Sequence, residues 1–557
     1  MSELSTATDS PAAAPPTSGA ATGPATGPAT GSATGSATGS ATGSATGPAT
    51  GPATGPATGS ATGSVSGPGS GSAASRAALD AARRILGENR VVGADGDAGR
   101  TRLLGPNTSL FRSRRVDAVL RPATAEQVGA IVALFSREPD SGSLHAVSTG
   151  RNWGLGSREP ARDDAVVLDL GGLDRVRALD LEAGWAVVEP GVTQGQLSRL
   201  LAHTSRMVNV TVSAAATSIV GNALDRGVGL RGQRTEDLAG LEVVLPGGET
   251  VRVGWWPAPG RTAPVYPHGL GPSALPLFVQ SNLGVVTAAV IRLPARPEAV
   301  RVTRLGFPAP ALAEVTDTVR RWVAQGLTRG VPRIYDPAAG NSYGGTEGEY
   351  TVHLAVDGTA ESVEALTGIL TAEARRSGLF TEVSAAEGAD PAHPNHEVTR
   401  LVERAYAGDP DITDTLFRAK MGVGADKIDT AAGFLFFLPL LPFTGEAVAR
   451  ADRLLREAAA ATGVRLSSTL HLLGADLVDC VVAMKFPHEE AAAERAHRAL
   501  DLLYESFTEA GFTPYRLDVD HAGQRDALAV DTAAVALVRR LKAVLDPNNA
   551  IAPGRYR

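Results

Sequence analysis

A glycine-rich loop at residues 149–157 carries the residue types and spacing best suited to binding chemistry. Residues 145–148 precede it and are predicted to form a strand that runs directly into the loop. Successive backbone N–H groups in such a loop form a nest for a diphosphate, and glycine allows positive φ and close approach of a ligand. The loop therefore predicts a diphosphate site, with a tight surface turn as the alternative.

Two further loops add to this signal, and the first of them again connects a predicted strand to a predicted helix. They are residues 189–193 and residues 218–223, and in the second of them Ser218 and Asn222 can donate side-chain hydrogen bonds. Each loop alone is a weak signal. The three together predict an extended and mostly uncharged dinucleotide site.

Two familiar motifs are set aside because their surroundings are wrong. Residues 227–232 match G-x-G-x-x-G, but polar residues flank them where the dinucleotide fingerprint needs a strand before and a helix after. Residues 340–344 match G-x-S-x-G around Ser342, but Asp-Pro-Ala-Ala leads in where a nucleophile elbow needs a strand. We expect a loop at Ser342.

Tyr515 and Arg516 place a phenol hydroxyl beside a permanently charged guanidinium group. Such a pair could bind an anionic oxygen. The alternative, which spacing alone favours, is a surface Arg516 paired with Asp518 or Asp520.

The remaining reactive side chains give weaker signals. His393 and His396 are the only close pair among ten histidines, no zinc-binding spacing is present, and we predict no metal site. His268 suits a turn or a ligand contact equally. Cys480 is the only cysteine, which excludes an internal disulfide, and its apolar strand predicts a buried, inert thiol.

Residues 1–75 differ from the rest of the chain in composition. From residue 21 to residue 64 the sequence repeats Ala-Thr-Gly-Pro or Ala-Thr-Gly-Ser eleven times, and no charged residue lies between Asp9 and Arg76. Such a stretch cannot bury enough apolar surface to offset its ordering entropy. It predicts a disordered, low-complexity tail.

The net charge of −7 over 557 residues argues against a nucleic-acid or membrane-surface binder. No secretory signal is visible at the N-terminus. The longest apolar run, residues 431–443, contains Pro439 and Pro442 and is too short to span a bilayer. These observations predict a cytoplasmic protein.

The order of the expected elements predicts two folded domains. Short strands and helices alternate up to residue 293, and longer strand–helix units follow Pro294. These units are strands at 350–356, 434–438 and 479–486, each followed by a helix, at 361–376, 445–462 and 489–510. They predict an α+β arrangement in which helices cover an antiparallel sheet, in a second domain that begins near residue 296.

Taken together, these segments resemble the vanillyl-alcohol oxidase and p-cresol methylhydroxylase family of FAD-dependent oxidoreductases. The similar stretches, in the same order, are residues 148–156, 187–193, 221–229, 241–245, 266–272, 277–287, 514–516, 545–548 and 552–555. The resemblance covers roughly residues 100–557 and is highly specific.

The resemblance implies an α+β fold with a two-part FAD-binding domain of the p-cresol methylhydroxylase type. Residues 76–295 would form it, residues 514–557 would complete it, and residues 296–513 would form a cap over the substrate. The implied FAD-binding residues are Ser148, Thr149, Gly150, Arg151, Asn152, Gly154, Ser157, Pro190, Gly191, Val192, Ser218, Gly221, Asn222, Gly284, Val286 and Arg555. Arg555 would lie near the flavin pyrimidine, where a cation stabilises reduced, anionic flavin.

The sequence also departs from the family pattern. Tyr515 and Arg516 match one tyrosine and the arginine that hold a phenolate, but Leu155 replaces the second tyrosine and Ser213 replaces an acid near the flavin. The position that carries flavin covalently in several members falls at Val478 or Asp479. Neither suits attachment, so we expect non-covalent FAD, with nearby His471 as the alternative.

The implied function is an oxidase or dehydrogenase that transfers a hydride from a substrate C–H bond to the flavin. Tyr515 and Arg516 would stabilise negative charge on the substrate oxygen. The substrate would be a small molecule, either a phenolic or benzylic compound or another alcohol or amine, including a specialised metabolite. The acceptor would be O2 or another oxidant, and a homodimer is a family expectation.

Two alternatives remain open. Leu155 and Ser213 remove expected polar groups, which favours a flavin-binding cyclase or isomerase without net oxidation. A serine hydrolase that uses Ser342 is the other.

Overall fold

The computed structural model of the chain describes residues 74–137, 141–258, 260, 264–385, 396–409 and 411–556. The predicted low-complexity tail falls, up to residue 73, outside the described residues, as does His393. The described residues all belong to one unit, Pro68–Arg557.

The first sheet presents the diphosphate-type loop. Its order is β1 (Val91–Gly93), β2 (Val116–Leu120), β4 (Ala165–Asp169) and β3 (Ser143–Val147). Both β2 and β3 run parallel to β4, so their carboxyl ends share one edge, and residues 148–157 leave β3 there. Helices α1 (Arg76–Leu86) and α3 (Ala125–Arg137) pack on this sheet, and α2 (Gly96–Arg102) lies between β1 and β2 in the chain.

The second sheet is antiparallel and supplies the other two loops. Its order is β5 (Val176–Asp180), β6 (Trp185–Val188), β9 (Val285–Arg292), β7 (Leu238–Val244) and β8 (Thr250–Gly254). Helix α4 (Gln194–Leu200) begins after the 189–193 loop, and α5 (Ile219–Leu224) begins after Ser218. Thr193 and Ser218 cap these helices by accepting a hydrogen bond from Gln196 N and Gly221 N respectively.

The third sheet follows a break at residues 293–298. Its order is β13 (Glu382–Ala385), β10 (Ala299–Pro308), β12 (Glu349–Gly358), β11 (Arg329–Tyr335), β16 (Leu466–Leu473), β17 (Leu477–Phe486) and β14 (Gly433–Phe437), and β15 (Leu440–Pro442) also pairs with β17. All strand pairs of this sheet are antiparallel among the described residues. Shorter helices connect its strands, namely α7 (Pro337–Gly340), α9 (His396–Tyr406), α10 (Ile412–Met421) and α11 (Ile428–Ala431).

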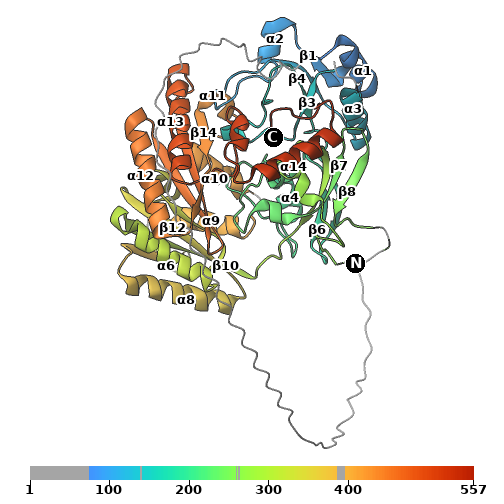
Figure 1. The fold of residues 1–557 in the computed structure, drawn as a ribbon. Coiled ribbons are helices and arrows are strands. Elements are labelled where there is room, and N and C mark those ends of the chain that lie inside the picture. Colours follow the sequence, from blue (N-terminus) through green and yellow to red (C-terminus); the bar gives the residue numbers. More distant parts are fainter. Residues whose placement is uncertain are drawn as a thin grey trace, which may run out of the picture. The chain divides into compact units, whose positions relative to one another are not determined.

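The two faces of the third sheet differ because side chains alternate along each strand. Leu305, Val352, Ile334, Leu470 and Cys480 form one cross-strand row and belong to the largest apolar cluster. Long helices cover this face, as Figure 1 shows. They are α6 (Leu312–Ala324), α8 (Ala360–Ser377), α12 (Gly445–Thr462) and α13 (Glu490–Glu509).

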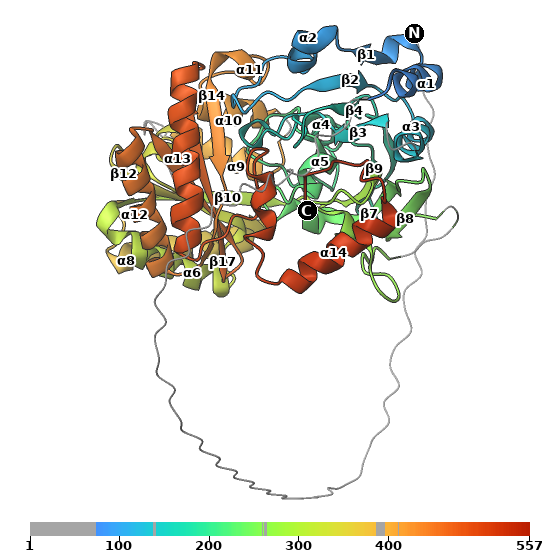
Figure 2. The ribbon, with the colours of Figure 1, turned by 45° about the horizontal axis from the view of Figure 1, so that its top comes forward.

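The C-terminal segment returns to both halves of the described chain. Tyr515 N donates to Leu438 O at 3.2 Å, directly after β14. Helix α14 (Thr532–Leu545) then leads back toward the first two sheets (Figures 1 and 2). There Leu144 of β3 donates to Ala550 O and accepts from Ala552 N, both at 2.7 Å. The last residues are thus held beside the start of the 148–157 loop.

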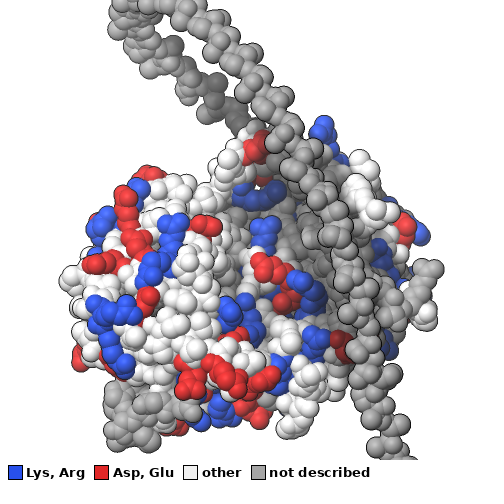
Figure 3. Space-filling view, turned by 90° about the horizontal axis from the view of Figure 1, so that it is seen from below, with Lys and Arg blue, Asp and Glu red and all other residues white. Residues whose placement is uncertain are grey.

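Acidic and basic side chains are mixed on the face seen in Figure 3, and neither sign dominates it. Among the described residues, no helix is both long and apolar enough to cross a membrane.

The α+β prediction is confirmed, including the antiparallel sheet covered by helices. The strand predicted at 350–356 is β12, the one at 434–438 is β14, and the one at 479–486 is β17. Sequence reasoning missed the other strands of the same sheet, which are β10, β11, β13, β15 and β16.

Phe437→Ala is expected to lower the free energy of unfolding by about 3–5 kcal/mol, because it leaves a cavity in the covered face. Phe437 is 1% exposed, and its ring meets Tyr504 and Phe507 edge-on at 5.0 and 5.2 Å. Denaturant or thermal unfolding measures the loss. Val530→Ala is the control, because this side chain is fully exposed. Equal unfolding of the two variants would contradict the packing described.

Candidate active site

A cavity of about 340 Å³ lies between the three loops of the first two sheets and the polar face of the third sheet. Loop residues 148–154 and the first turn of α5 form one side. Side chains from β11, β14, β16 and β17 form the other, together with Phe417, Lys420 and Met421 of α10. The C-terminal residues Arg555 and Tyr556 complete the wall. Ligand sites in proteins are commonly concave and of this size.

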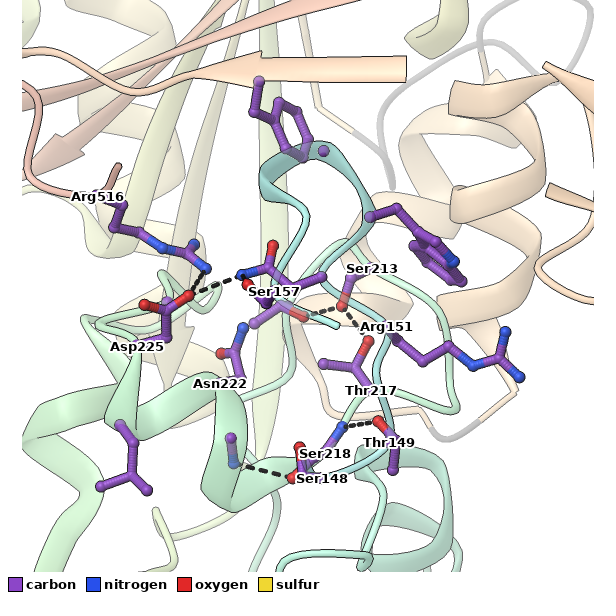
Figure 4. A pocket seen from close by; sticks show the side chains of 18 of the residues that line it. Ser148, Thr149, Arg151, Ser157, Ser213, Thr217, Ser218, Asn222, Asp225 and Arg516 are labelled. Carbon is purple, nitrogen blue, oxygen red and sulfur yellow. Dashed lines mark hydrogen bonds and ion pairs between the residues drawn. The ribbon is translucent and has the colours of Figure 1, made fainter. Parts of the chain in front are cut away.

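The three loops interlock through short contacts. Ser218 N donates to Thr149 Oγ1 at 3.2 Å, and Ser218 Oγ donates to Pro190 O at 2.6 Å. Gly150 has φ of +65°, which a larger residue would adopt only under strain. A Cβ added to Gly221 would lie 2.4 Å from Ser148 Oγ, so glycine allows the close approach of α5 to Ser148. Figure 4 shows the loops meeting around Ser148, Thr149 and Ser218.

Most of the residues predicted to bind FAD line this cavity. They are Ser148, Thr149, Gly150, Arg151, Asn152, Gly154, Ser157, Pro190, Ser218, Gly221, Asn222, Gly284, Val286 and Arg555. Gly191 and Val192 do not line the cavity. Gly191 N donates to Leu173 O at 2.7 Å, and the Val192 side chain is buried in the apolar cluster of the second sheet.

Asp225 binds three groups from distant parts of the chain. Its carboxylate pairs with Arg516, accepts from Asn152 Nδ2 at 2.7 Å, and accepts from the Tyr556 hydroxyl at 3.2 Å. Figure 4 shows Arg516 and Asp225 pointing toward one another. The alternative of a surface Arg516 paired with Asp518 or Asp520 is therefore wrong. The Arg516 side chain is only 10% exposed, and its partner Asp225 directly follows α5.

Tyr515 points to a carboxylate that sequence reasoning did not assign to the site. Its hydroxyl donates to Asp479 Oδ2 at 3.3 Å, and His471 Nδ1 lies 3.1 Å from the same oxygen. Asp479 is fully buried, and its Oδ1 has no hydrogen-bond partner among the described residues. Burial, together with the Asp479 charge, raises the pKa of Tyr515 well above its usual value. Burial and Arg333 lower the pKa of His471 to about 4, so this imidazole is neutral at pH 7.

The two positions that depart from the family pattern are both filled without a charge. Leu155 packs with Leu438, Val481 and the Tyr515 side chain. Ser213 Oγ lies 2.8 Å from Thr217 Oγ1 in a network of uncharged hydroxyl groups (Figure 4).

The candidates for flavin attachment face different ways. Val478 and Cys480 are fully buried in the covered apolar cluster, and burial raises the pKa of the Cys480 thiol well above its usual value. The thiol is therefore buried, as predicted. Asp479 and His471 line the cavity.

The residues present fit an FAD on their hydrogen-bonding capacity. Arg555 Nη1 and Asn222 Oδ1 are buried polar atoms of the cavity wall without a partner among the described residues. Such atoms carry a desolvation cost unless a ligand binds them. Arg555 also supplies a permanent positive charge, 4% exposed, at the end of the chain.

The motifs that the sequence analysis set aside do not have the local structure that their functions require. Residues 227–232 follow helix α5 and close a turn through the Val228–Gln233 bridge, so they form no Rossmann fingerprint. Ser342 follows helix α7 where a loop was expected, and no strand leads into it. Among the described residues, no histidine hydrogen-bonds to Ser342. His268 lies in an exposed turn against Tyr266.

Fold and cavity together define a flavin-binding protein of the p-cresol methylhydroxylase type, and comparisons with known proteins agree. Residues 116–254 match the family model described as FAD binding domain. The chain is 30% identical over 540 residues to 1'-carboxy-chondrochloren decarboxylase of Chondromyces crocatus, covering 86% of this chain and 96% of that protein.

Two further comparisons support the same conclusion. The 4-cresol dehydrogenase (hydroxylating) flavoprotein subunit of Pseudomonas putida is 26% identical, covering 79% of this chain and 87% of that protein. A crystal structure of p-cresol methylhydroxylase with substrate bound shares the fold with a TM-score of 0.77 at 22% identity, covering 87% and 98% of the two chains. The chain belongs to the vanillyl-alcohol oxidase and p-cresol methylhydroxylase family and is an FAD-dependent oxidoreductase.

His521 stabilises the segment that carries Tyr515 and Arg516. Its ring lies 2.8 Å from Asp518 and 3.0 Å from Asp501 of α13, and it stacks on Tyr504. Burial opposes the charged imidazole, but the two carboxylates outweigh burial and raise the pKa of His521. This stabilisation is therefore fully present below about pH 6.5 and is lost as the pH rises through the folded-state pKa.

His521→Gln is expected to lower Tm by more at pH 6 than at pH 9, because only the protonated imidazole gains from both carboxylates. Scanning calorimetry at the two pH values measures the difference. His268→Gln serves as the control because His268 is exposed. A Tm loss for His521→Gln that is the same at both pH values would contradict the assigned charge.

Proposed function

We propose that this enzyme oxidises a small molecule by removing a hydride from a C–H bond next to an oxygen or nitrogen atom. The observation that carries the proposal is the Tyr515–Asp479 hydrogen bond at the cavity wall, next to the Arg516–Asp225 pair. The substrate would be a phenolic or benzylic compound, another alcohol or an amine. FAD, when bound, supplies the hydride acceptor, and O2 or another oxidant would reoxidise it.

We assign residues 76–295 and 514–557 to FAD binding and residues 296–513 to the cap. The strand pairing supports this division, because the third sheet starts at Ala299 and ends at Phe486. The hydrogen bonds between Leu144 and the segment around Ile551 support the return of the C-terminus to the FAD side. The loop residues 148–157 would hold the diphosphate, and Arg555 would face the flavin pyrimidine.

The side chains of the site suggest a route for the substrate proton. Asp479 Oδ1 is buried and has no partner among the described residues, so it can accept a proton from a substrate hydroxyl or amine. The neutral His471, protonated at Nδ1, would donate to the other carboxylate oxygen and hold its orientation. On substrate binding the Tyr515 hydroxyl, which has a single proton, would donate to the substrate oxygen in place of Asp479 Oδ2, and the Arg516 charge would stabilise negative charge there.

Tyr515→Phe, Arg516→Ala and Asp479→Asn are expected to slow flavin reduction by about 10²–10⁴-fold, because each removes a group that handles proton or charge. Anaerobic stopped-flow absorbance measures the rate. Tyr266→Phe is the matched control, because Tyr266 is 57% exposed and does not line the cavity. Unchanged reduction rates in all three variants would rule out this assignment.

We also propose that FAD is bound non-covalently. Val478 and Cys480 point into the apolar cluster, and Asp479 is engaged by His471 and Tyr515. Acid precipitation is expected to release the flavin absorbance into the supernatant. Flavin that stays in the pellet would contradict the proposal, and His471→Ala would then test the remaining attachment site.

A second candidate is a cyclase or isomerase reaction without net oxidation. Leu155 favours it, because it places an apolar side chain against Tyr515 where a phenol would hold a phenolate. Substrate-dependent bleaching of the flavin under anaerobic conditions would reject this candidate. A homodimer and a cytoplasmic location remain proposals that rest on the family expectation and on composition.

A further inference from the structure

A row of polar side chains crosses the polar face of the third sheet, which is the face opposite the covering helices. Arg304, His353, Arg333, His471 and Asp479 are successive cross-strand neighbours on β10, β12, β11, β16 and β17. Cross-strand neighbours point to the same face of a sheet. The last three of the row line the cavity, and the first two do not.

The two arginines of this row differ in their partners. Arg304 pairs with Glu382 and donates to Gly344 O at 2.6 Å. Arg333 is 2% exposed, and its Nε is buried without a hydrogen-bond partner. Within the described residues, no carboxylate lies at ion-pair distance from Arg333. A guanidinium stays charged, so a buried one without an anion is costly.

The neighbours of Arg333 do not neutralise it. Burial lowers the pKa of His353 to about 3 and that of His471 to about 4, with Arg333 contributing to both shifts. Each flanking imidazole is therefore neutral. Tyr335, which hydrogen-bonds to Arg333, and Tyr343 are buried phenols, and burial raises the pKa of both against the opposing Arg333 charge, so neither is an anion. Asp479, the nearest acid of the row, is engaged by His471 and Tyr515.

A second cation and several aromatic rings surround the same end of the cavity. Lys420 of α10 lines it and lies over the Phe436 ring at 5.0 Å. Burial, Lys485 and Arg333 lower the pKa of Lys420 to about 7, with Asp479 opposing. Arg516, by contrast, forms an ion pair with Asp225 beside Tyr515. This end of the cavity thus carries the permanent charge of Arg333 and part of the Lys420 charge, and the rings of Phe417, Phe434 and Phe436 line the same cavity.

We propose that Arg333 binds the carboxylate of an aromatic acid substrate, whose reacting end lies at Tyr515 and Asp479. The proposal rests on the proposed function, because it names the substrate class of that same site. A guanidinium fork matches a planar carboxylate in a bidentate manner, and the aromatic walls suit a ring between the two ends. Arg333 and Asp479 lie two strands apart, a spacing of about 10 Å. That span suits an acid of the size of 4-hydroxycinnamate.

Isothermal titration calorimetry of the FAD-loaded wild type with 4-hydroxycinnamate and with its uncharged amide tests the proposal. The acid is expected to bind at least about tenfold more tightly than the amide, because a hydrogen bond to a charged partner is worth that much. Arg333→Gln is expected to remove this preference while the affinity for the amide stays unchanged. Arg333→Lys, which keeps the charge but loses the fork, is expected to retain part of it.

Arg304→Gln is the matched control, because Arg304 is equally buried in the same row but does not line the cavity. Equal affinity of the wild type for acid and amide would overturn the proposal. So would a preference that survives in Arg333→Gln, or one that Arg304→Gln abolishes as well. If Arg333→Gln does not fold, wild-type affinity for the acid in Arg333→Lys would overturn it.

Calorimetry needs no turnover, so this test is separate from that of the proposed function. If the acid binds through Arg333 and flavin reduction is normal in the Tyr515 variant, the carboxylate site is supported and the proposed catalytic roles are rejected. If reduction is slowed in the Tyr515 variant but the wild type shows no preference for the acid, the catalytic roles are supported and the carboxylate site is rejected.

Discussion

The Asp225 carboxylate holds together the three segments that define the candidate site. Asn152 brings the diphosphate-type loop to it, Arg516 brings the segment after the cap sheet, and Tyr556 brings the C-terminus. Arg516 is nearly buried, so loss of its anion would leave an uncompensated charge, which costs about 3–5 kcal/mol in buried pairs. The position of Tyr515 follows from this contact, because Tyr515 directly precedes Arg516 and is fixed on its other side by Leu438.

The alternation of side chains in the third sheet lets the same strands serve both stability and chemistry. One row, from Leu305 to Cys480, lies under the covering helices and excludes water. The neighbouring row, one residue earlier on β10, β11 and β17, turns Arg333 and Asp479 toward the cavity. A shift of one residue in register would exchange these faces, so the apolar core also fixes the orientation of the site.

Local patterns were enough to predict the loops and much of the fold, but not the middle of the third sheet. The glycines of residues 149–157 and the caps Thr193 and Ser218 act through nearby backbone, so the chain sequence reveals them. Strands β11 and β16 were missed because Arg333 and His471 interrupt their apolar pattern. Those polar residues face a cavity, which only neighbouring strands create. Sequence reasoning considered Asp479 only for flavin attachment, because its contacts with His471 and Tyr515 also form only in the tertiary structure.

The linear sequence was sufficient for the composition of the chain, the dinucleotide-type loops, the α+β class and the resemblance to flavin oxidoreductases. The pairing of charges depended on the tertiary structure. Arg516 meets Asp225 across 291 residues, although Asp518 and Asp520 are its nearest acids in the chain. Tyr515 likewise meets Asp479, and Arg333 meets no acid among the described residues. Spacing along a chain reports backbone conformation and sidedness, whereas a charge selects its partner only after sheets and loops have closed around it.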